Sequence, residues 1–120
     1  MKIKRDSLDI LFSKIVRTRD GWECQRCRGR YDPPNKALHC AHNHSRRHES
    51  VRWEEDNACS LDFGCHQLLD SHPIEKIEFF DKRLGKERNR ELYLRSKVPT
   101  KVDRDLVLMR LRARAKELGI

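Results

Sequence analysis

The sequence predicts a small α+β domain in which a metal-stabilised core is wrapped by basic helices. Three observations support this fold class: a length of 120 residues, an apolar content of only 37%, and a series of closely spaced cysteines and histidines in the first two thirds of the chain. One domain fits this length, but so few apolar residues bury only a small core. A bound metal ion is therefore expected to contribute to folding.

Charge is distributed unevenly along the chain, which carries +8 in total. Residues 1–31 carry +5 and residues 74–120 carry +6, whereas residues 32–73 carry −3. Basic arms around a weakly acidic centre fit a protein that holds a polyanion with its arms and a cation at its centre. We therefore expect nucleic acid as the partner rather than a membrane, although the same charges would also keep a protein soluble.

The cysteines indicate metal ligands or free thiols rather than a disulfide framework. The chain has five, an odd number: Cys24, Cys27, Cys40, Cys59 and Cys65. The N-terminus has no apolar signal segment, and no apolar run is long enough to span a membrane. We therefore expect a cytoplasmic protein.

The first element is expected to be a helix over Ser7–Arg19, because Leu8, Phe12 and Ile15 recur at helical spacing. Either Asp6 or Ser7 can cap this helix, and Gly21 ends it.

A zinc-knuckle signature follows. Cys24 and Cys27 form a Cys-x-x-Cys pair, and Gly29 comes two residues later. Two unrelated thiols or a redox pair are the alternatives, but a redox pair would need a strand–helix context that the sequence does not show.

Two short strands are expected next. Residues 37–44 predict a strand with Cys40, His42 and His44 on one face and His39 and Ala41 on the other. Residues 51–53 predict a second strand, and residues 54–57 a turn.

Helices are expected for the rest of the chain. One begins near Gly64, and Pro73 lies in the first turn of the next, whose apolar stripe is Ile77, Phe80 and Leu84. Gly85 interrupts the pattern before a helix over 87–97. Residues 98–100 form a linker, and the last helix covers 103–118, with Leu108, Leu111, Ala115 and Leu118 on one side.

The middle of the chain contains His42, Asn57 and His66, separated by 15 and 9 residues. Hydrolysis of a phosphodiester needs a group that takes a proton from water near neutral pH, and histidine suits that task. It also needs a cation to stabilise the leaving oxygen, and a second histidine can bind one. An asparagine between them can fix their geometry.

These three residues and the cysteines around them resemble the HNH endonucleases, which have the ββα-metal (His-Me finger) fold. The segments Cys40-Ala41-His42 and Arg52–Asn57 resemble the phage NinG-type recombination proteins most. The resemblance covers about residues 22–72 and implies one HNH-like domain over 1–120, with helical extensions at 1–21 and 73–120.

The resemblance assigns a role to each of the three residues. It implies His42 as general base, Asn57 as positioning residue and His66 as ligand of a catalytic Mg²⁺ or Mn²⁺. It further implies a structural Zn²⁺, duplex or branched DNA as substrate, 5′-phosphate and 3′-hydroxyl products, and a bacterial host cell if a phage encodes the protein.

The sequence departs from the family pattern at two positions. Many members have a metal ligand directly before the general base, where this chain has Ala41; His44 is the best substitute, and Asp70 competes with it. Their second knuckle commonly reads Cys-x-x-Cys-His, where this chain has Asp62 and then Cys65-His66. Cys24, Cys27 and Cys65 are thus three expected zinc ligands, and the fourth is Asp62, Cys59 or Cys40.

Two other functions fit the same residues. One is a zinc-containing nucleic-acid-binding module without catalysis, which the alanine at position 41 favours. The other is a structural zinc domain that recruits a protein partner. A steep salt dependence of DNA binding would separate the second from the others, and a nicking assay with divalent metals would separate nuclease from binding module. The sequence predicts no oligomeric state.

Overall fold

The first helix forms where the sequence predicts it. In the computed structural model, which describes residues 3–120, α1 spans Ser7–Arg19. The Asp6 carboxylate accepts hydrogen bonds from the N–H groups of Leu8 and Asp9 at 3.0 and 3.2 Å. The Asp9 side chain in turn accepts one from the Asp6 N–H at 2.9 Å. This reciprocal capping box satisfies N–H groups that have no partner within the helix.

The sheet has two antiparallel strands, β1 (Leu38–His42) and β2 (Ala58–Asp62). Leu38 lies opposite Asp62, and His42 lies opposite Ala58. β1 falls within the predicted segment 37–44. His42 therefore lies at one end of the sheet and Asp62 at the other. Each of these residues belongs to a different group of polar side chains, described below.

The second strand does not lie where the sequence predicts it. Residues 51–53 belong to the short helix α2 (Glu49–Arg52) and the position after it. The Arg52 guanidinium donates to the buried Asp9 carboxylate at 2.6 and 3.1 Å, and the Trp53 indole N–H donates to it at 3.1 Å. These contacts hold the segment against α1, so tertiary structure overrides the strand propensity of a valine and a tryptophan.

The remaining helices begin and end close to the predicted positions. They are α3 (Phe63–Ser71), α4 (Pro73–Leu84), α5 (Lys86–Ser96) and α6 (Arg104–Glu117), and a 3₁₀ turn, η1 (Glu55–Asn57), precedes β2. Pro73 is the first residue of α4, where its missing N–H costs nothing. Gly85 separates α4 from α5 with φ of 87°, a conformation that suits glycine. The Asp103 side chain caps α6.

One predicted helix face is corrected by the structure and another is extended. Ile77 exposes 56% of its surface, whereas Phe80, three residues on, exposes 1%. In α6 the predicted side does face the core: Leu111 and Ala115 are buried, and Leu108 and Leu118 pack against the same cluster partly buried. The prediction omitted Val107, which is also buried there and begins the row Val107, Leu111 and Ala115. Residues four apart lie on one face of a helix, and this row is the one that packs against α1.

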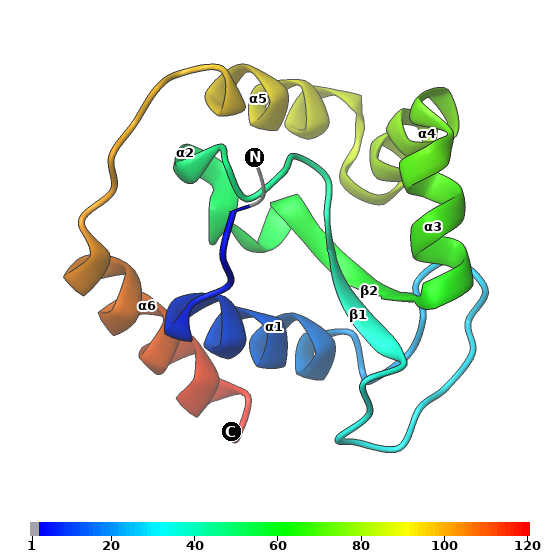
Figure 1. Cartoon of the computed structure of the whole chain (residues 1–120), viewed down its shortest axis with the longest axis horizontal. Helices are drawn as coiled ribbons and strands as arrows, with labels where there is room; N and C mark the ends of the chain where they lie inside the picture. The colour runs from blue at the N-terminus through cyan, green and yellow to red at the C-terminus, as the bar shows by residue number, and fades with distance from the viewer. Residues whose placement is uncertain (1–2) are drawn as a thin grey trace.

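The apolar core is divided into two clusters. The first, called here the α1 cluster, lies between α1 and α6 and includes Phe12, Ile15 and Trp53. The second, called here the α3 cluster, lies between the sheet, α3 and α4 and includes Leu61 and Phe80. Figure 1 shows the sheet in the middle of the molecule, with α1 below it, α3 and α4 to one side and α5 above. The fold is thus a compact α+β arrangement of six α-helices and a two-stranded sheet within residues 3–120.

β1 presents different side chains to the two clusters. Cys40 packs against the α1 cluster, and the His42 ring lies 5.7 Å from the Phe12 ring. Ala41 belongs to the α3 cluster, and the His39 ring lies 5.3 Å from the His66 ring of α3. This alternation agrees with the predicted faces. None of the helices within residues 3–120 is both apolar and long enough to cross a bilayer.

Candidate metal centre and histidine group

Four side chains converge into a group that can hold a metal ion such as zinc: Cys24, Cys27, Asp62 and Cys65, called here the cysteine site. Their ligand atoms all lie within 4.8 Å of one another. The first two come from the loop between α1 and β1, Asp62 ends β2, and Cys65 lies in the first turn of α3. Three thiols and one carboxylate make a four-ligand set of the kind that zinc binds.

The loop that carries Cys24 and Cys27 is a tight turn anchored to the sheet. The Arg28 N–H donates to the Cys24 carbonyl, and the Cys24 N–H donates to the Gly29 carbonyl, both at 2.9 Å. The positive φ of this turn, 67°, belongs to Arg28 and not to the glycine after it. The Gln25 N–H donates to the Ser60 carbonyl of β2 at 2.9 Å, which fixes the turn beside the strand.

Asp62 has two roles in the structure. Its Oδ1 accepts a hydrogen bond from the Cys65 N–H at 2.8 Å and caps α3. Its Oδ2 accepts one from the Cys27 thiol at 2.9 Å. A cysteine at this position would be a poorer helix cap. The carboxylate therefore orients the helix that brings Cys65 into the site.

A hydrogen bond joins two of the four possible ligands, the Cys27 thiol and the Asp62 carboxylate. This hydrogen bond raises the pKa of Cys27 to about 12. The same bond lowers the pKa of Asp62, and the Cys65 N–H lowers it further. A metal ion binds thiolate, so it would replace this shared proton, and binding is expected to release protons.

Cys59 and Cys40, the other two candidates for the fourth ligand, lie outside the cysteine site. Cys59 is fully buried in the α3 cluster, and Cys40 faces the α1 cluster on the other side of the sheet. Burial raises the pKa of each thiol to about 12. The structure therefore brings Asp62, rather than either of these cysteines, to the three expected thiols.

A second polar group joins β1 to α3. The Nδ1 atoms of His39 and His66 lie 3.1 Å apart. The Nε2 of His66 lies 3.2 Å from the Asp70 carboxylate, whose other oxygen accepts from the Lys76 ammonium at 2.9 Å. A carboxylate beside Nε2 favours a proton on that nitrogen, so the Nδ1 lone pair of His66 faces His39. Burial lowers the pKa of His66, which favours the neutral ring.

His42 and His44, at and beyond the end of β1, have unpaired ring nitrogens. The Nε2 atom of each is buried and has no hydrogen-bond partner within residues 3–120. Burial lowers the pKa of His42 to about 4, and the charge of Arg46 adds to this effect. Burial likewise lowers the pKa of His44 to about 4. Both rings are therefore neutral at pH 7. The unpaired Nε2 atom of each ring is a candidate ligand for a cation or acceptor of a hydrogen bond.

Asn57 holds the chain just beyond β1. It is fully buried, and its side chain accepts from the His44 N–H and donates to the His44 carbonyl, both at 2.9 Å. Its own carbonyl accepts from the Asn43 N–H at 2.7 Å. Three hydrogen bonds thus fix the two residues that follow His42.

The structure brings together some of the predicted residues and separates others. His66 lies against His39, which the sequence analysis did not single out, while His42 points to the opposite face of β1. His39 stands two residues before Ala41, on the same strand face. The alternation of strand residues was the signal that could have identified it.

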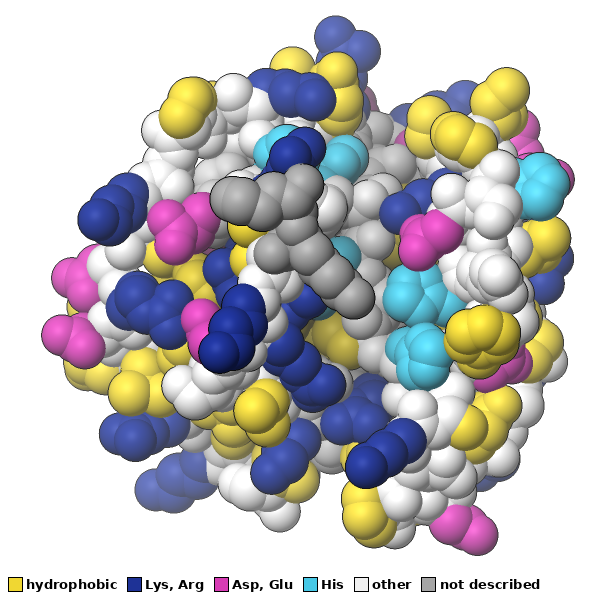
Figure 2. Space-filling view, in the orientation of Figure 1, with side chains coloured by type: hydrophobic (Ala, Val, Ile, Leu, Met, Phe, Trp, Pro, Cys, Tyr) yellow, Lys and Arg dark blue, Asp and Glu magenta, His cyan; other side chains and the backbone are white. Residues whose placement is uncertain are grey.

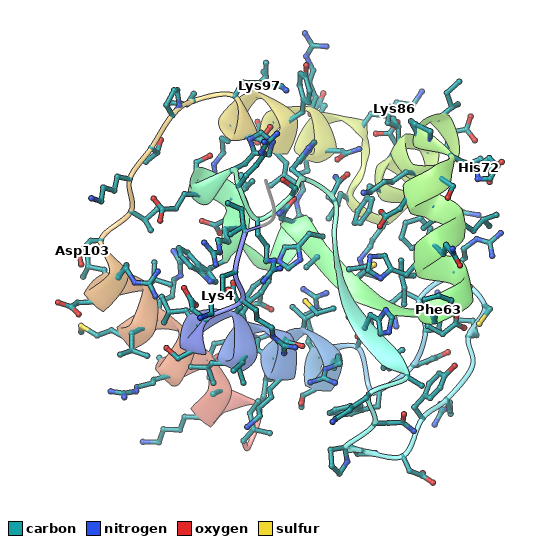
Figure 3. All side chains as sticks on the ribbon, in the orientation of Figure 1. Lys4, Phe63, His72, Lys86, Lys97 and Asp103 are labelled. Carbon is teal, nitrogen blue, oxygen red and sulfur yellow. The ribbon has the colours of Figure 1, made fainter. Side chains whose placement is uncertain are left out.

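Histidine side chains nevertheless open onto one face of the molecule. Figure 2 shows several histidine side chains on this face, between α5 and α3. We call His39, His42, His44 and His66 the histidine group. The exposed ring of Phe63 borders it, 6.0 Å from the His39 ring, at the start of α3 (Figure 3).

The acidic residues before Asn57 are neutralised by arginines. Glu54 lies 3.0 Å from Arg95, Glu55 lies 3.1 Å from Arg114, and Asp56 lies 2.6 Å from Arg88. These arginines belong to α5 and α6. Residues 54–56 belong to the acidic segment that was predicted to hold a cation. In the structure these three acids instead form ion pairs with α5 and α6.

Searches of protein-family models, of curated proteins and of solved structures found no match to this chain.

Proposed function

We propose that this protein is a divalent-metal-dependent HNH-type endonuclease that hydrolyses DNA phosphodiester bonds and contains a structural zinc. The observation that carries the proposal is the pair of histidine Nδ1 atoms 3.1 Å apart, one on a strand and one on a helix, with a carboxylate behind the helical ring. Unpaired histidines at the end of the same strand supply candidates for a general base.

The His39–His66 pair fits a divalent cation. Two nitrogens that each lie about 2.0–2.1 Å from one ion are separated by about 2.9–3.4 Å, depending on the coordination geometry. The 3.1 Å separation lies within this range. Asp70 would hold His66 in the tautomer that ligates through Nδ1, which is the usual arrangement behind a metal-bound histidine. His39 thereby offers the ligand that Ala41 cannot.

The chemistry is divided among the residues of the histidine group. When bound at His39 and His66, the divalent cation would stabilise the charge that develops on the phosphate and the leaving oxygen. We assign His42 as the group that takes a proton from the attacking water, because its Nε2 atom has no hydrogen-bond partner within residues 3–120. Burial lowers the pKa of this ring to about 4, which makes it a weak base until water or substrate reaches it. Asn57 keeps the end of β1 in place through the His44 backbone.

The cysteine site has a separate, structural role in this proposal. Its four ligands leave no open position for substrate, as in structural zinc sites. A zinc ion there would join the 24–29 turn, β2 and α3, and so would hold His66 opposite His39. Its contribution to catalysis is therefore indirect.

A zinc-containing nucleic-acid-binding module is the second candidate. Ala41 is 98% buried in the α3 cluster, so the position before His42 offers no ligand. The His42 ring also packs on Phe12, on the face of β1 away from His66. Both observations favour binding without cleavage.

A plasmid-nicking assay separates the two candidates. Supercoiled DNA is incubated with the protein in Mg²⁺, Mn²⁺, Ni²⁺ or Zn²⁺, and His42→Ala is compared with His72→Ala, an exposed histidine outside the group. Loss of a general base typically slows a reaction on the order of 10²–10⁴-fold, whereas His72→Ala should cut at the wild-type rate. A His42→Ala variant that cuts as fast as wild type would exclude the assigned base.

A further inference from the structure

A groove beside the histidine group carries positive charge. It lies between the loop before α2 and the segment after α5, and its volume is about 760 Å³. Its charged lining consists of Arg47, Lys97 and Lys101 together with Glu49, and His48 adds a titratable ring. The groove therefore carries net positive charge even with His48 neutral.

The cations of this groove differ from the arginines of α5 and α6. Arg88, Arg95 and Arg114 each pair with an acidic side chain of residues 54–56, at 2.6, 3.0 and 3.1 Å. By contrast, the groove cations Arg47, Lys97 and Lys101 have no ion-pair partner anywhere in residues 3–120. Their charge remains available to an external anion, whereas much of the helical charge is already compensated.

Tyr93 links the groove to the histidine group. The ring of Tyr93, on α5, lies 5.9 Å from the His44 ring. The Lys97 ammonium lies 5.0 Å from the centre of the Tyr93 ring. One aromatic side chain thus connects the end of the Asn57-held loop to the first lysine of the groove, which Figure 3 labels at the end of α5.

Both walls of the groove are held in place. The Ser50 hydroxyl donates to the Arg95 carbonyl at 2.6 Å and joins α2 to the last turn of α5. The Val98 N–H donates to the same carbonyl at 3.2 Å. The Lys97 N–H donates to the Leu94 carbonyl at 3.2 Å. Lys97 therefore projects from backbone that is already fixed, so little backbone order has to be gained there when an anion binds.

We infer that this groove binds the sugar–phosphate backbone of the DNA strand beside the histidine group, without reading bases. The inference rests on the proposed function for the identity of the polyanion. Lysine and arginine side chains that contact phosphates supply affinity but no sequence information. The occupant is assigned by charge complementarity and by the link through Tyr93 to the histidine group.

The test is a pair of matched double variants. Lys97→Gln/Lys101→Gln removes two groove charges, and Lys14→Gln/Lys116→Gln removes two exposed charges from α1 and α6, on the opposite side of the molecule from α5 (Figure 1). Binding of a labelled random-sequence duplex is measured by fluorescence anisotropy over a salt series, without added divalent metal. Thermal melting checks that each variant is folded.

The groove variant should bind at least tenfold more weakly, and its salt slope should fall by roughly 1.8, about 0.9 per lost phosphate contact. The control variant should stay within twofold of wild type. Equal effects of the two variants, or an unchanged slope in the groove variant, would overturn the inference, and so would a wild-type protein that binds no DNA.

Lysine acetylation of the wild-type protein gives an independent readout that needs no substitution. DNA should protect Lys97 and Lys101 but not Lys14 and Lys116, as measured by mass spectrometry. Protection of the second pair alone would contradict the groove. A protein that binds through the groove but never nicks DNA would refute the nuclease and leave the groove standing. A wild-type protein that nicks DNA, together with a groove variant whose salt slope is unchanged, would refute the groove and leave the nuclease standing.

Discussion

The cysteine site and the histidine group differ in how their side chains are assembled. The four members of the cysteine site share one point in space, with all ligand atoms within 4.8 Å of one another. The histidine group is spread along β1 and onto α3, and its two halves lie on opposite faces of the strand. In the first, Asp62 and the Cys27 thiol already satisfy each other. In the second, His42 and His44 retain buried nitrogens without partners.

This difference separates a structural role from a chemical one. A closed set of ligands, shared between a loop, a strand and a helix, can stabilise the fold when an ion binds, because the unfolded chain offers no such site. Buried ring nitrogens without partners cost stability, and proteins tend to retain such groups where they are used. The predictions that follow test this division, beginning with the largest effect.

Removal of metal from the cysteine site is expected to unfold the protein. Ligand binding at structural zinc sites supplies on the order of 10 kcal/mol, comparable to the whole stability of a domain of this size. Elemental analysis of protein purified without added metal should find about one zinc per chain, as one four-ligand site requires. Circular dichroism during titration with a chelator should show cooperative loss of helix.

Two substitutions at Asp62 separate its ligand role from its role as helix cap. Asp62→Asn keeps an oxygen that can accept from the Cys65 N–H, whereas Asp62→Ala removes both functions. If the carboxylate is a ligand, both variants should lose zinc affinity, and Asp62→Ala should also lose about 1 kcal/mol of helix-cap stability. Full zinc affinity in Asp62→Asn would show that the carboxylate is only a cap.

Asn57→Ala should be the most damaging change near the histidine group. It removes two hydrogen bonds to the His44 backbone from a fully buried position, so the unfolding free energy should fall by about 2–4 kcal/mol. Zinc content should stay at the wild-type level, because Asn57 lies outside the cysteine site. Urea unfolding together with metal analysis measures both. Parallel loss of zinc would contradict the separation of the two regions.

Asp70→Asn should weaken the second cation site without affecting the first. The carboxylate orients His66 from behind, and loss of such a partner typically costs 10–100-fold in metal affinity. Calorimetric titration of zinc-loaded protein with Mn²⁺ measures this affinity. Glu75→Gln, an exposed change on α4, serves as the control and should bind Mn²⁺ like wild type. Equal affinities in all three proteins would remove Asp70 from the site.

Mild acidification is expected to have the smallest effect. The pKa values of His42 and His44 are lowered to about 4 by burial, so the unfolded chain binds more protons than the folded protein between pH 6.5 and 4. Stability is therefore full above pH 6.5 and is lost as pH falls through this window. From pH 7 to pH 6 each ring should contribute about 0.7 kcal/mol of loss. Urea midpoints for wild type and His44→Gln should show a shallower pH dependence in the variant.

Local signals predicted the elements that local interactions stabilise. The cap at Asp6, the proline at position 73 and the glycine at position 85 act within a few residues, and the helices they delimit lie close to where they were predicted. The second strand was placed incorrectly, because Val51 favours a strand only in isolation. In the structure, Arg52 and the buried Asp9 form a hydrogen-bonded ion pair across 43 residues of sequence, which no local pattern reveals.

The same reasoning explains what could be predicted of the sites. The spacing of Cys24 and Cys27 indicated a metal turn, and Cys65 was the expected partner. The choice among three fourth ligands depended on how β2 leads into α3, which places Asp62 next to the Cys27 thiol. His39 was missed because its importance comes from the strand register that sets it against His66. The acids of the central segment were expected to hold a cation. Asp62 does belong to the cysteine site, but the acids at 54–56 contact arginines distant in sequence.

His66→Ala tests the account most directly, because His66 neighbours Cys65 in sequence yet belongs to the other group. Zinc content, thermal midpoint and plasmid cleavage in Mn²⁺ are measured on one preparation, with His72→Ala alongside. The account predicts about one zinc per chain, a thermal midpoint near that of wild type, and cleavage slowed at least about 100-fold. Two results would contradict it: a His66→Ala protein that cuts like wild type, or a wild-type protein that fails to cut DNA with every divalent metal tested.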